Sequence, residues 1–142
     1  SAIFLDADSR VAVLPPIGAF PTGLAVLPVV RKSIAAHLEA CGPWRLPAFE
    51  ELARDLTGNS DVLRDARWCH ETLIAVTKDG NEGQFFRAWD RAADLMLRRG
   101  VHSGEGGVIG LAAACAGWAT DYEALARLDP FIRHEGGGPK EG

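Results

Sequence analysis

The sequence is poor in residues that form covalent frameworks or bind metals. In 142 residues it holds three cysteines, far apart from one another, and four scattered histidines, and no C-x-x-C, H-x-x-x-H or H-E-x-x-H pattern occurs. Cysteines in odd number and at wide spacing argue against a disulfide framework and against a structural zinc site. No nucleophile–base arrangement is recognisable. We therefore expect no metal site, no cofactor and no catalytic residue.

A surplus of positive charge is also missing. The chain has 15 Lys and Arg against 19 Asp and Glu, a formal net charge of −4. That balance argues against charge-driven binding to nucleic acid or to an anionic membrane. No apolar segment with positively charged flanks opens the sequence, and lysine is scarce beside arginine, alanine and glycine, as in GC-rich bacterial genomes. We expect a soluble, cytoplasmic bacterial protein with no membrane partner.

The composition that remains is that of one globular domain. Hydrophobic residues make up 47% of the chain and charged residues 24%, close to the averages of globular proteins. A chain of this length can bury a core. The last stretch, HEGGGPKEG, has almost nothing apolar to bury. We predict a single domain over residues 1–133 and a flexible tail over residues 134–142.

The N-terminus predicts a β-hairpin followed by a rigid connector. Apolar residues alternate in Ile3–Leu5 and again in Val11–Val13, and the polar residues between them have turn chemistry. The prolines of PPIGAFPTG, residues 15–23, exclude regular strand pairing.

The same start, IFLDADSRV, resembles the first motif of haloacid-dehalogenase-type phosphotransferases. The resemblance implies a nucleophile at Asp6 and an acid–base group at Asp8, both around a magnesium ion. Because no alternating strand–helix units follow to build the parallel sheet of that family, we favour a hairpin turn.

After the connector, apolar residues recur at helical spacing. Predicted helices cover residues 28–41, 47–56, 61–78 and 82–99 and a glycine- and alanine-rich segment within residues 102–130 that ends at Asp129–Pro130. The loop DGN predicts that the 61–78 and 82–99 helices form an antiparallel pair. Small residues such as Gly110 and Ala114 predict close backbone approach in a central helix. The expected fold is mostly α, a short N-terminal β-hairpin followed by four or five packed helices.

The segment RDARWCHETL, residues 64–73, concentrates reactive side chains on one predicted helix. A helical wheel places Cys69 on the apolar stripe and Arg64, Trp68 and Glu71 on the far side. An exposed indole forfeits several kcal/mol of possible burial. Either another element covers Trp68, or these three residues form a surface that binds a partner.

Two family resemblances include part of this segment. Residues 49–68 resemble a helix-turn-helix, which implies a DNA-binding regulator, although Asp61 and Asp65 would repel phosphate. The Arg-x5-His spacing of Arg64 and His70 resembles that of the HEPN group of helical ribonucleases, which implies RNA cleavage by a dimer.

A glycine-rich loop, HSGEGGVIG, opens the last predicted helix. Backbone N–H groups around Gly104, Gly106 and Gly107 could bind an anion there. The spacing matches neither a dinucleotide fingerprint nor a P-loop. We favour close helix packing as the reason for these glycines.

These observations favour a non-enzymatic protein. We expect a macromolecular-interaction, regulatory or accessory protein whose partner is another protein or a second copy of itself in a homo-oligomer. A helix-turn-helix regulator is the second expectation, and an RNA-cleaving helical enzyme is the third. Nucleic acid is not the favoured partner because the net charge is negative.

Overall fold

The computed structural model describes residues 2–5, 9–11, 23–27, 30–77, 80–101, 104–126 and 132–134. Helices form the larger part of the regular structure among these residues, so the expected mostly α fold class is confirmed. The strands are β1 (Ala2–Leu5), β2 (Ser9–Val11), β3 (Gly23–Leu27), β4 (His70–Thr77), β5 (Thr120–Asp121) and β6 (Ile132–His134). The helices are α1 (Ile34–Cys41), α2 (Leu46–Thr57), α3 (Val62–Asp65), α4 (Glu82–Arg98) and α5 (Glu105–Cys115), with a 3₁₀ turn η1 (Pro43–Arg45) between α1 and α2.

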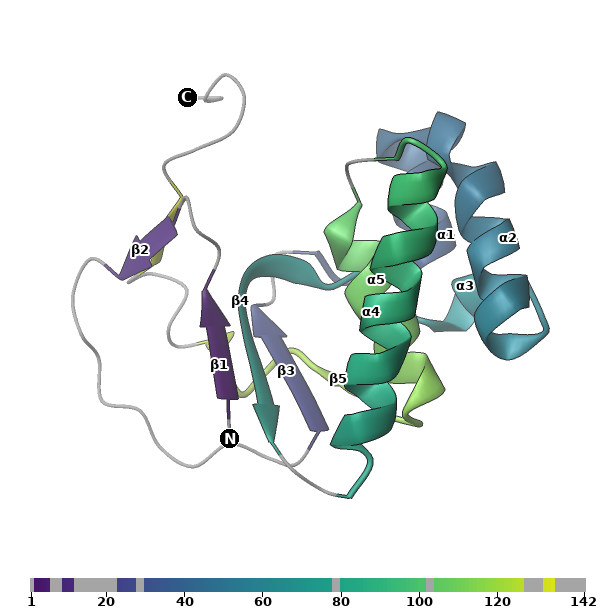
Figure 1. Ribbon diagram of the computed structural model, residues 1–142. Coiled ribbons are helices and arrows are strands. Elements are labelled where there is room, and N and C mark those ends of the chain that lie inside the picture. Colours follow the sequence, from purple (N-terminus) through teal and green to yellow (C-terminus); the bar gives the residue numbers. More distant parts are fainter. Residues whose placement is uncertain are drawn as a thin grey trace.

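Four of the strands form one sheet in the order β1-β4-β3-β5 (Figure 1). β4 pairs antiparallel with both β1 and β3, and β5 adds to β3 in parallel. The predicted N-terminal hairpin is wrong, because β1 pairs with β4 while β2 pairs with β6 in a separate two-stranded sheet. Alternation of apolar residues predicts a strand but does not choose its partner, and the ladder to β4 includes every residue of β1.

One face of the sheet packs on α4 and α5, which run side by side and antiparallel (Figure 1). Alternate residues of β3 and β4 lie in this layer with Phe85 of α4 and Ile109 of α5, and all of them are buried. The strand residues are Leu24, Val26, Ile74 and Val76. Full burial of side chains of this size contributes about 1.5–3 kcal/mol each, so this layer holds the sheet on the helices.

The predicted helix over residues 61–78 is wrong, and with it the antiparallel pair formed with 82–99. Only Val62–Asp65 are helical, and residues 70–77 form the strand β4 between β1 and β3. A short apolar run fits a buried strand as well as a helix, so its spacing alone does not decide between them. Residues 70–77 are a strand because they form hydrogen bonds to β1 on one side and to β3 on the other. The helix that packs beside α4 is α5.

The remaining helix predictions hold, with two boundaries changed. The last predicted helix ends at Cys115 and not at Asp129–Pro130, because Thr120–Asp121 leave the helix to pair with β3 as the strand β5. The predictions for α2 and α4 agree with the structure to within one residue at either end. α1 begins at Ile34 rather than at residue 28, because Ser33 caps it: the Ser33 hydroxyl accepts a hydrogen bond from the Ala36 amide at 3.1 Å. The segment before it contains β3, which the sequence did not predict.

α5 lies at the centre of the helices, as the sequence predicted for this segment. Every residue from Gly106 to Ala113 is buried. A Cβ atom at Gly110 would collide with the carbonyl oxygen of Arg67, and one at Gly106 would collide with that of Cys69. The predicted close backbone approach is confirmed, and it brings the chain between α3 and β4 directly against α5.

Some expectations lie outside the described residues. They are the turn at Asp6–Asp8, the connector over 15–22 and the tail beyond His134. His134 itself is the last residue of β6. Within the part of the chain that the structure describes, no helix combines the length and the apolar character needed to span a bilayer.

Candidate functional site

Trp68 is buried in the helical core, with only 6% of its surface exposed. Its ring centroid lies 4.1 Å from that of His37 on α1 and 6.4 Å from that of Phe49 on α2. Of the two explanations that the sequence allowed, cover by other elements is correct, and a binding surface centred on Trp68 is excluded. The helical wheel misplaced this residue because the chain at Trp68 is not helical.

The other residues of that predicted surface lie on different elements. Arg64 is exposed on α3, whereas Glu71 belongs to β4, and its side chain lies outside the described part of the structure. The recognition helix expected within 49–68 does not form, because α3 has four residues. Arg64 and His70 share no helix, which removes the structural basis of the HEPN resemblance.

The glycines before and within α5 serve packing. Gly104 is the N-cap residue with φ of 104°, a left-handed conformation that favours glycine. Cβ atoms at Gly106 and Gly107 would press against the Trp68 indole, and the Gly106 carbonyl accepts a hydrogen bond from the Cys69 amide at 3.0 Å. Protein atoms fill the space on the Cβ side of Gly106 and Gly107, which agrees with close packing as the reason for these glycines, and an anion site at this loop stays a prediction.

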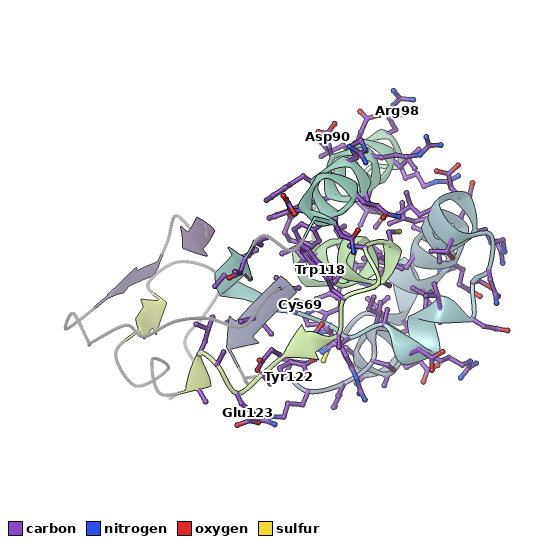
Figure 2. The ribbon with its side chains drawn as sticks, turned by 90° about the horizontal axis from the view of Figure 1, so that it is seen from below. Cys69, Asp90, Arg98, Trp118, Tyr122 and Glu123 are labelled. Atoms are coloured by element: carbon purple, nitrogen blue, oxygen red, sulfur yellow. The ribbon has the colours of Figure 1, made fainter. Side chains whose placement is uncertain are left out.

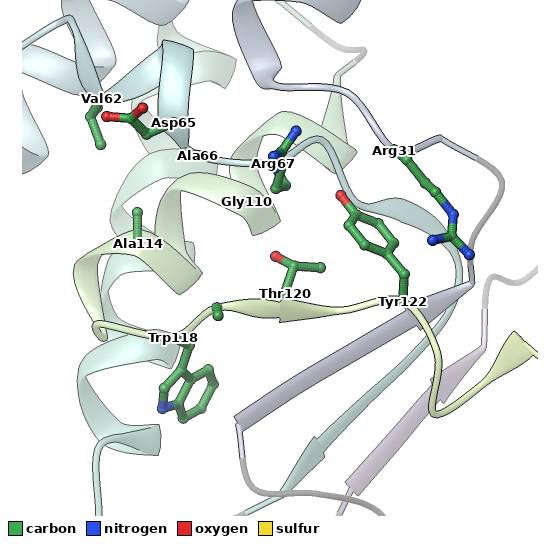
Figure 3. A pocket seen from close by; sticks show the side chains of 11 residues that line it. Arg31, Val62, Asp65, Ala66, Arg67, Gly110, Ala114, Trp118, Thr120 and Tyr122 are labelled. Carbon is green, nitrogen blue, oxygen red and sulfur yellow. The ribbon is translucent and has the colours of Figure 1, made fainter.

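A cleft of about 560 Å³ opens between the end of α5, strand β5 and the chain that joins α3 to β4 (Figure 3). Small-molecule sites have volumes of about 300–1,000 Å³. The polar side chains that line the cleft are Arg31, Asp65, Arg67, Thr120 and Tyr122. These residues come from segments far apart in the sequence, and the fold brings them together around one cavity.

Small residues account for the space inside the cleft. They are Ala66, Gly110, Ala114 and Ala119. At Gly110 the backbone of the α3–β4 connection packs against α5, and beyond that contact the short side chains leave a hollow. Trp118 also lines the cleft, but its ring stacks on Phe85 of α4 at a centroid distance of 4.9 Å.

Tyr122 joins the cleft to the helical core. Its hydroxyl donates a hydrogen bond to the carbonyl oxygen of Trp68 at 3.2 Å. Burial raises the pKa of the Tyr122 phenol to about 12, and the nearby Cys69 thiol adds to the rise. The phenol is therefore protonated at neutral pH, so it anchors the wall of the cleft and does not act as a base.

Arg31 is oriented at the edge of the cleft by two contacts. Its guanidinium pairs with the Glu123 carboxylate at 2.8 Å and lies 5.6 Å from the centre of the Tyr122 ring. Figure 2 shows Tyr122 and Glu123 together on the β5 side, whereas Asp90 and Arg98 point outward from α4. An exposed ion pair contributes only about 0–1 kcal/mol, so these contacts position Arg31 more than they stabilise the fold.

Asp65 and Arg67 are the other charged residues of the cleft, and both are exposed. Neither forms an ion pair with any residue that the structure describes. They lie two positions apart in the chain and on the same cavity, so the cleft presents charges of both signs to solvent.

Cys69 lies behind the wall of the cleft. It is fully buried, with its Sγ atom 3.6 Å from the Arg67 carbonyl oxygen and 3.8 Å from the Thr120 hydroxyl. The prediction that Cys69 is a core residue is confirmed. In the described ranges, no three histidine, cysteine, aspartate or glutamate side chains gather in a group that could hold a metal ion.

Sequence reasoning missed Arg31, Thr120 and Tyr122 as site residues. They approach the cleft only because β5 pairs with β3, and the sequence predicted neither strand. The signal that the sequence did carry was the run of small residues around Gly110 and Ala114, which predicted close packing without predicting the cavity beside it.

Comparison of the chain with protein-family models, with curated proteins and with solved structures found no match in any of the three.

Proposed function

We propose that the protein binds a small organic molecule in the cleft between α5, β5 and the α3–β4 connection. The observation that carries the proposal is the cleft itself, about 560 Å³ in volume, with small apolar residues inside and a few polar groups around it. Concave sites of this volume with a few converging polar groups are the usual form of small-molecule sites.

The walls of the cleft are held by contacts within the protein. The Tyr122 hydroxyl bonds to the Trp68 carbonyl, and the Trp118 amide donates to the Ala113 carbonyl at 2.9 Å. Both bonds join groups of the protein itself and brace the wall, and a braced wall loses little conformational freedom on binding, which favours affinity.

Binding is favoured over catalysis by the state of the reactive side chains. The Cys69 thiol is buried behind the wall, and the Tyr122 phenol, with a pKa raised to about 12, keeps its proton at neutral pH. Neither group is placed to attack or to deprotonate a molecule in the cleft.

Filling the cleft tests the proposal. Ala114→Phe puts an aromatic ring into the cavity without changing charge, and Ala40→Phe on the exposed side of α1 is the matched control. In a fragment screen read by amide NMR, we expect bound fragments to shift the Ala66 and Thr120 amides in the wild-type and control proteins but not in Ala114→Phe. Shifts that persist in Ala114→Phe, or that map to another face of the wild type, contradict the proposal.

Contact with another protein or self-association stays a prediction. An exposed aromatic residue that could carry it is Trp44 on η1, which is 67% exposed beside the exposed Pro43. Aromatic residues are enriched in protein interfaces. If a second copy docks on Trp44, the Trp44→Ser variant sediments as a monomer at concentrations where the wild type forms dimers. A wild type that stays monomeric at every concentration removes this candidate.

A further inference from the structure

The positively charged side chains of the cleft are concentrated at one end. Arg31 and Arg67 lie on the Tyr122 side, whereas Asp65 lies at the α3 end (Figure 3). Glu123, the ion-pair partner of Arg31, does not line the cavity. Among the described residues that line the cavity, the wall at the Tyr122 end therefore has two guanidinium groups and no carboxylate, and of the two only Arg31 is paired with a carboxylate outside the cavity.

The backbone beneath the Arg67 side chain is held on two sides. An antiparallel bridge pairs Arg67 with Ser33, and the neighbouring Trp68 amide donates to the Lys32 carbonyl at 2.9 Å. On the other side, Gly110 of α5 leaves space only for the Arg67 carbonyl. The guanidinium thus extends from a rigid point, and less conformational freedom is lost when it binds a ligand.

The Arg67 guanidinium is available to a ligand. It is exposed, and across the described part of the chain no carboxylate lies within ion-pair distance of it. A guanidinium presents five N–H donors in a planar fork that matches the oxygens of a carboxylate or a phosphate. The Thr120 hydroxyl lines the same cavity and offers a further polar contact.

We infer that the molecule bound in this cleft carries an anionic group, a carboxylate or a phosphate monoester, which binds to Arg67 at the Tyr122 end. The inference rests on the proposed function, since it requires the cleft to hold a small molecule. Arg31, whose charge is balanced by Glu123, adds further N–H donors beside the Tyr122 ring. The uncharged part of the molecule then lies against the small residues around Ala114.

Four probes of similar size separate the charge of the ligand from its shape. Phenylacetate and phenyl phosphate are anions, phenylacetamide is neutral and phenethylamine is a cation. In NMR titrations of the full chain, we expect both anions to shift the Arg67 and Thr120 amides with affinities roughly tenfold or more above those of the other two probes, because a hydrogen bond to a charged group is stronger than a neutral one.

Three variants test the role of each charge. Arg67→Gln keeps a polar, hydrogen-bonding side chain but removes the charge and the guanidinium, and should weaken the binding of both anions roughly tenfold. Arg54→Gln, on an exposed position of α2, is the matched control and should leave both affinities unchanged. Asp65→Asn removes a negative charge from the cavity and should strengthen the binding of both anions. A retained wild-type amide spectrum shows that each variant is folded.

The outcomes distinguish failure of this inference from failure of the proposed function. The inference is overturned, while the cleft remains a binding site, if phenylacetamide or phenethylamine binds there as tightly as the anions. It is also overturned if Asp65→Asn lowers the affinity for the anions. If Arg67→Gln and Arg54→Gln lower the affinity for the anions equally, the inference is also overturned, because the effect then comes from the net charge of the protein. If no probe shifts any amide of the cleft, both the inference and the proposed function fail.

Discussion

Tyr122 is the residue through which the cleft and the core depend on each other. It is the only tyrosine in the chain, and its hydroxyl donates to the carbonyl of the buried Trp68. A carbonyl in such a place needs a donor, because an unsatisfied polar group next to the core is costly. The bond therefore ties the segment after β5 to the helical core.

The Tyr122→Phe variant should show this dependence as a loss of stability. Removing the hydroxyl leaves the Trp68 carbonyl without its donor, and we expect the free energy of unfolding to fall by about 1 kcal/mol. Urea denaturation followed by tryptophan fluorescence measures the change. An unchanged free energy of unfolding would mean that solvent replaces the bond.

The raised pKa of Tyr122 predicts a specific pH dependence. Burial favours the neutral phenol in the folded state, so the pKa rises from 10.0 to about 12. The stabilisation is present below pH 10 and is lost as the pH rises through about 12, so wild-type stability should fall in this range more than that of Tyr122→Phe. Because no other tyrosine is present, the absorbance of tyrosinate reports this group alone, and an apparent pKa near 10 would contradict the burial of its hydroxyl.

Among the structural elements, α5 sets the geometry of the cleft because two backbones meet at Gly110. Its glycines and alanines make a poor amphipathic pattern, yet every residue from Gly106 to Ala113 is buried. The carbonyl of Arg67 occupies the position where a Cβ of residue 110 would lie. The burial of α5 thus comes from small residues that allow close approach to its neighbours, and less from an apolar stripe.

A matched pair of glycine substitutions tests this role of α5. Gly110→Ala must displace backbone, and we expect it to destabilise the fold by about 1–3 kcal/mol. In Gly83→Ala in α4, the new Cβ atom meets only the flexible end of the Arg87 side chain, so this variant should stabilise the fold by about 0.4–1 kcal/mol. Thermal unfolding of both variants measures the difference. If both variants change the stability of the fold in the same direction, the close approach at Gly110 is contradicted.

For the molecule as a whole, the sequence predicted the elements whose type is decided locally. The helices α2 and α4 have amphipathic stripes and are followed closely by the glycines Gly58 and Gly100, and their bounds agree with the prediction. The strands β3, β4 and β5 were missed because their hydrogen-bond partners lie far away in the chain. The cleft was missed for the same reason. Arg31 and Tyr122 come close to Arg67 only after the sheet has formed, so no local sequence pattern could predict the site.

A crystal structure of the protein soaked with phenyl phosphate shows whether the ligand binds, where it binds and which side chains it contacts. We expect the phosphate oxygens within hydrogen-bonding distance of the Arg67 guanidinium and the phenyl ring beside Ala114, in the cleft next to Tyr122. Phenyl phosphate bound on another surface, or a cleft that contains only water at saturating ligand, would contradict the assignment of this cavity as an anion-binding small-molecule site.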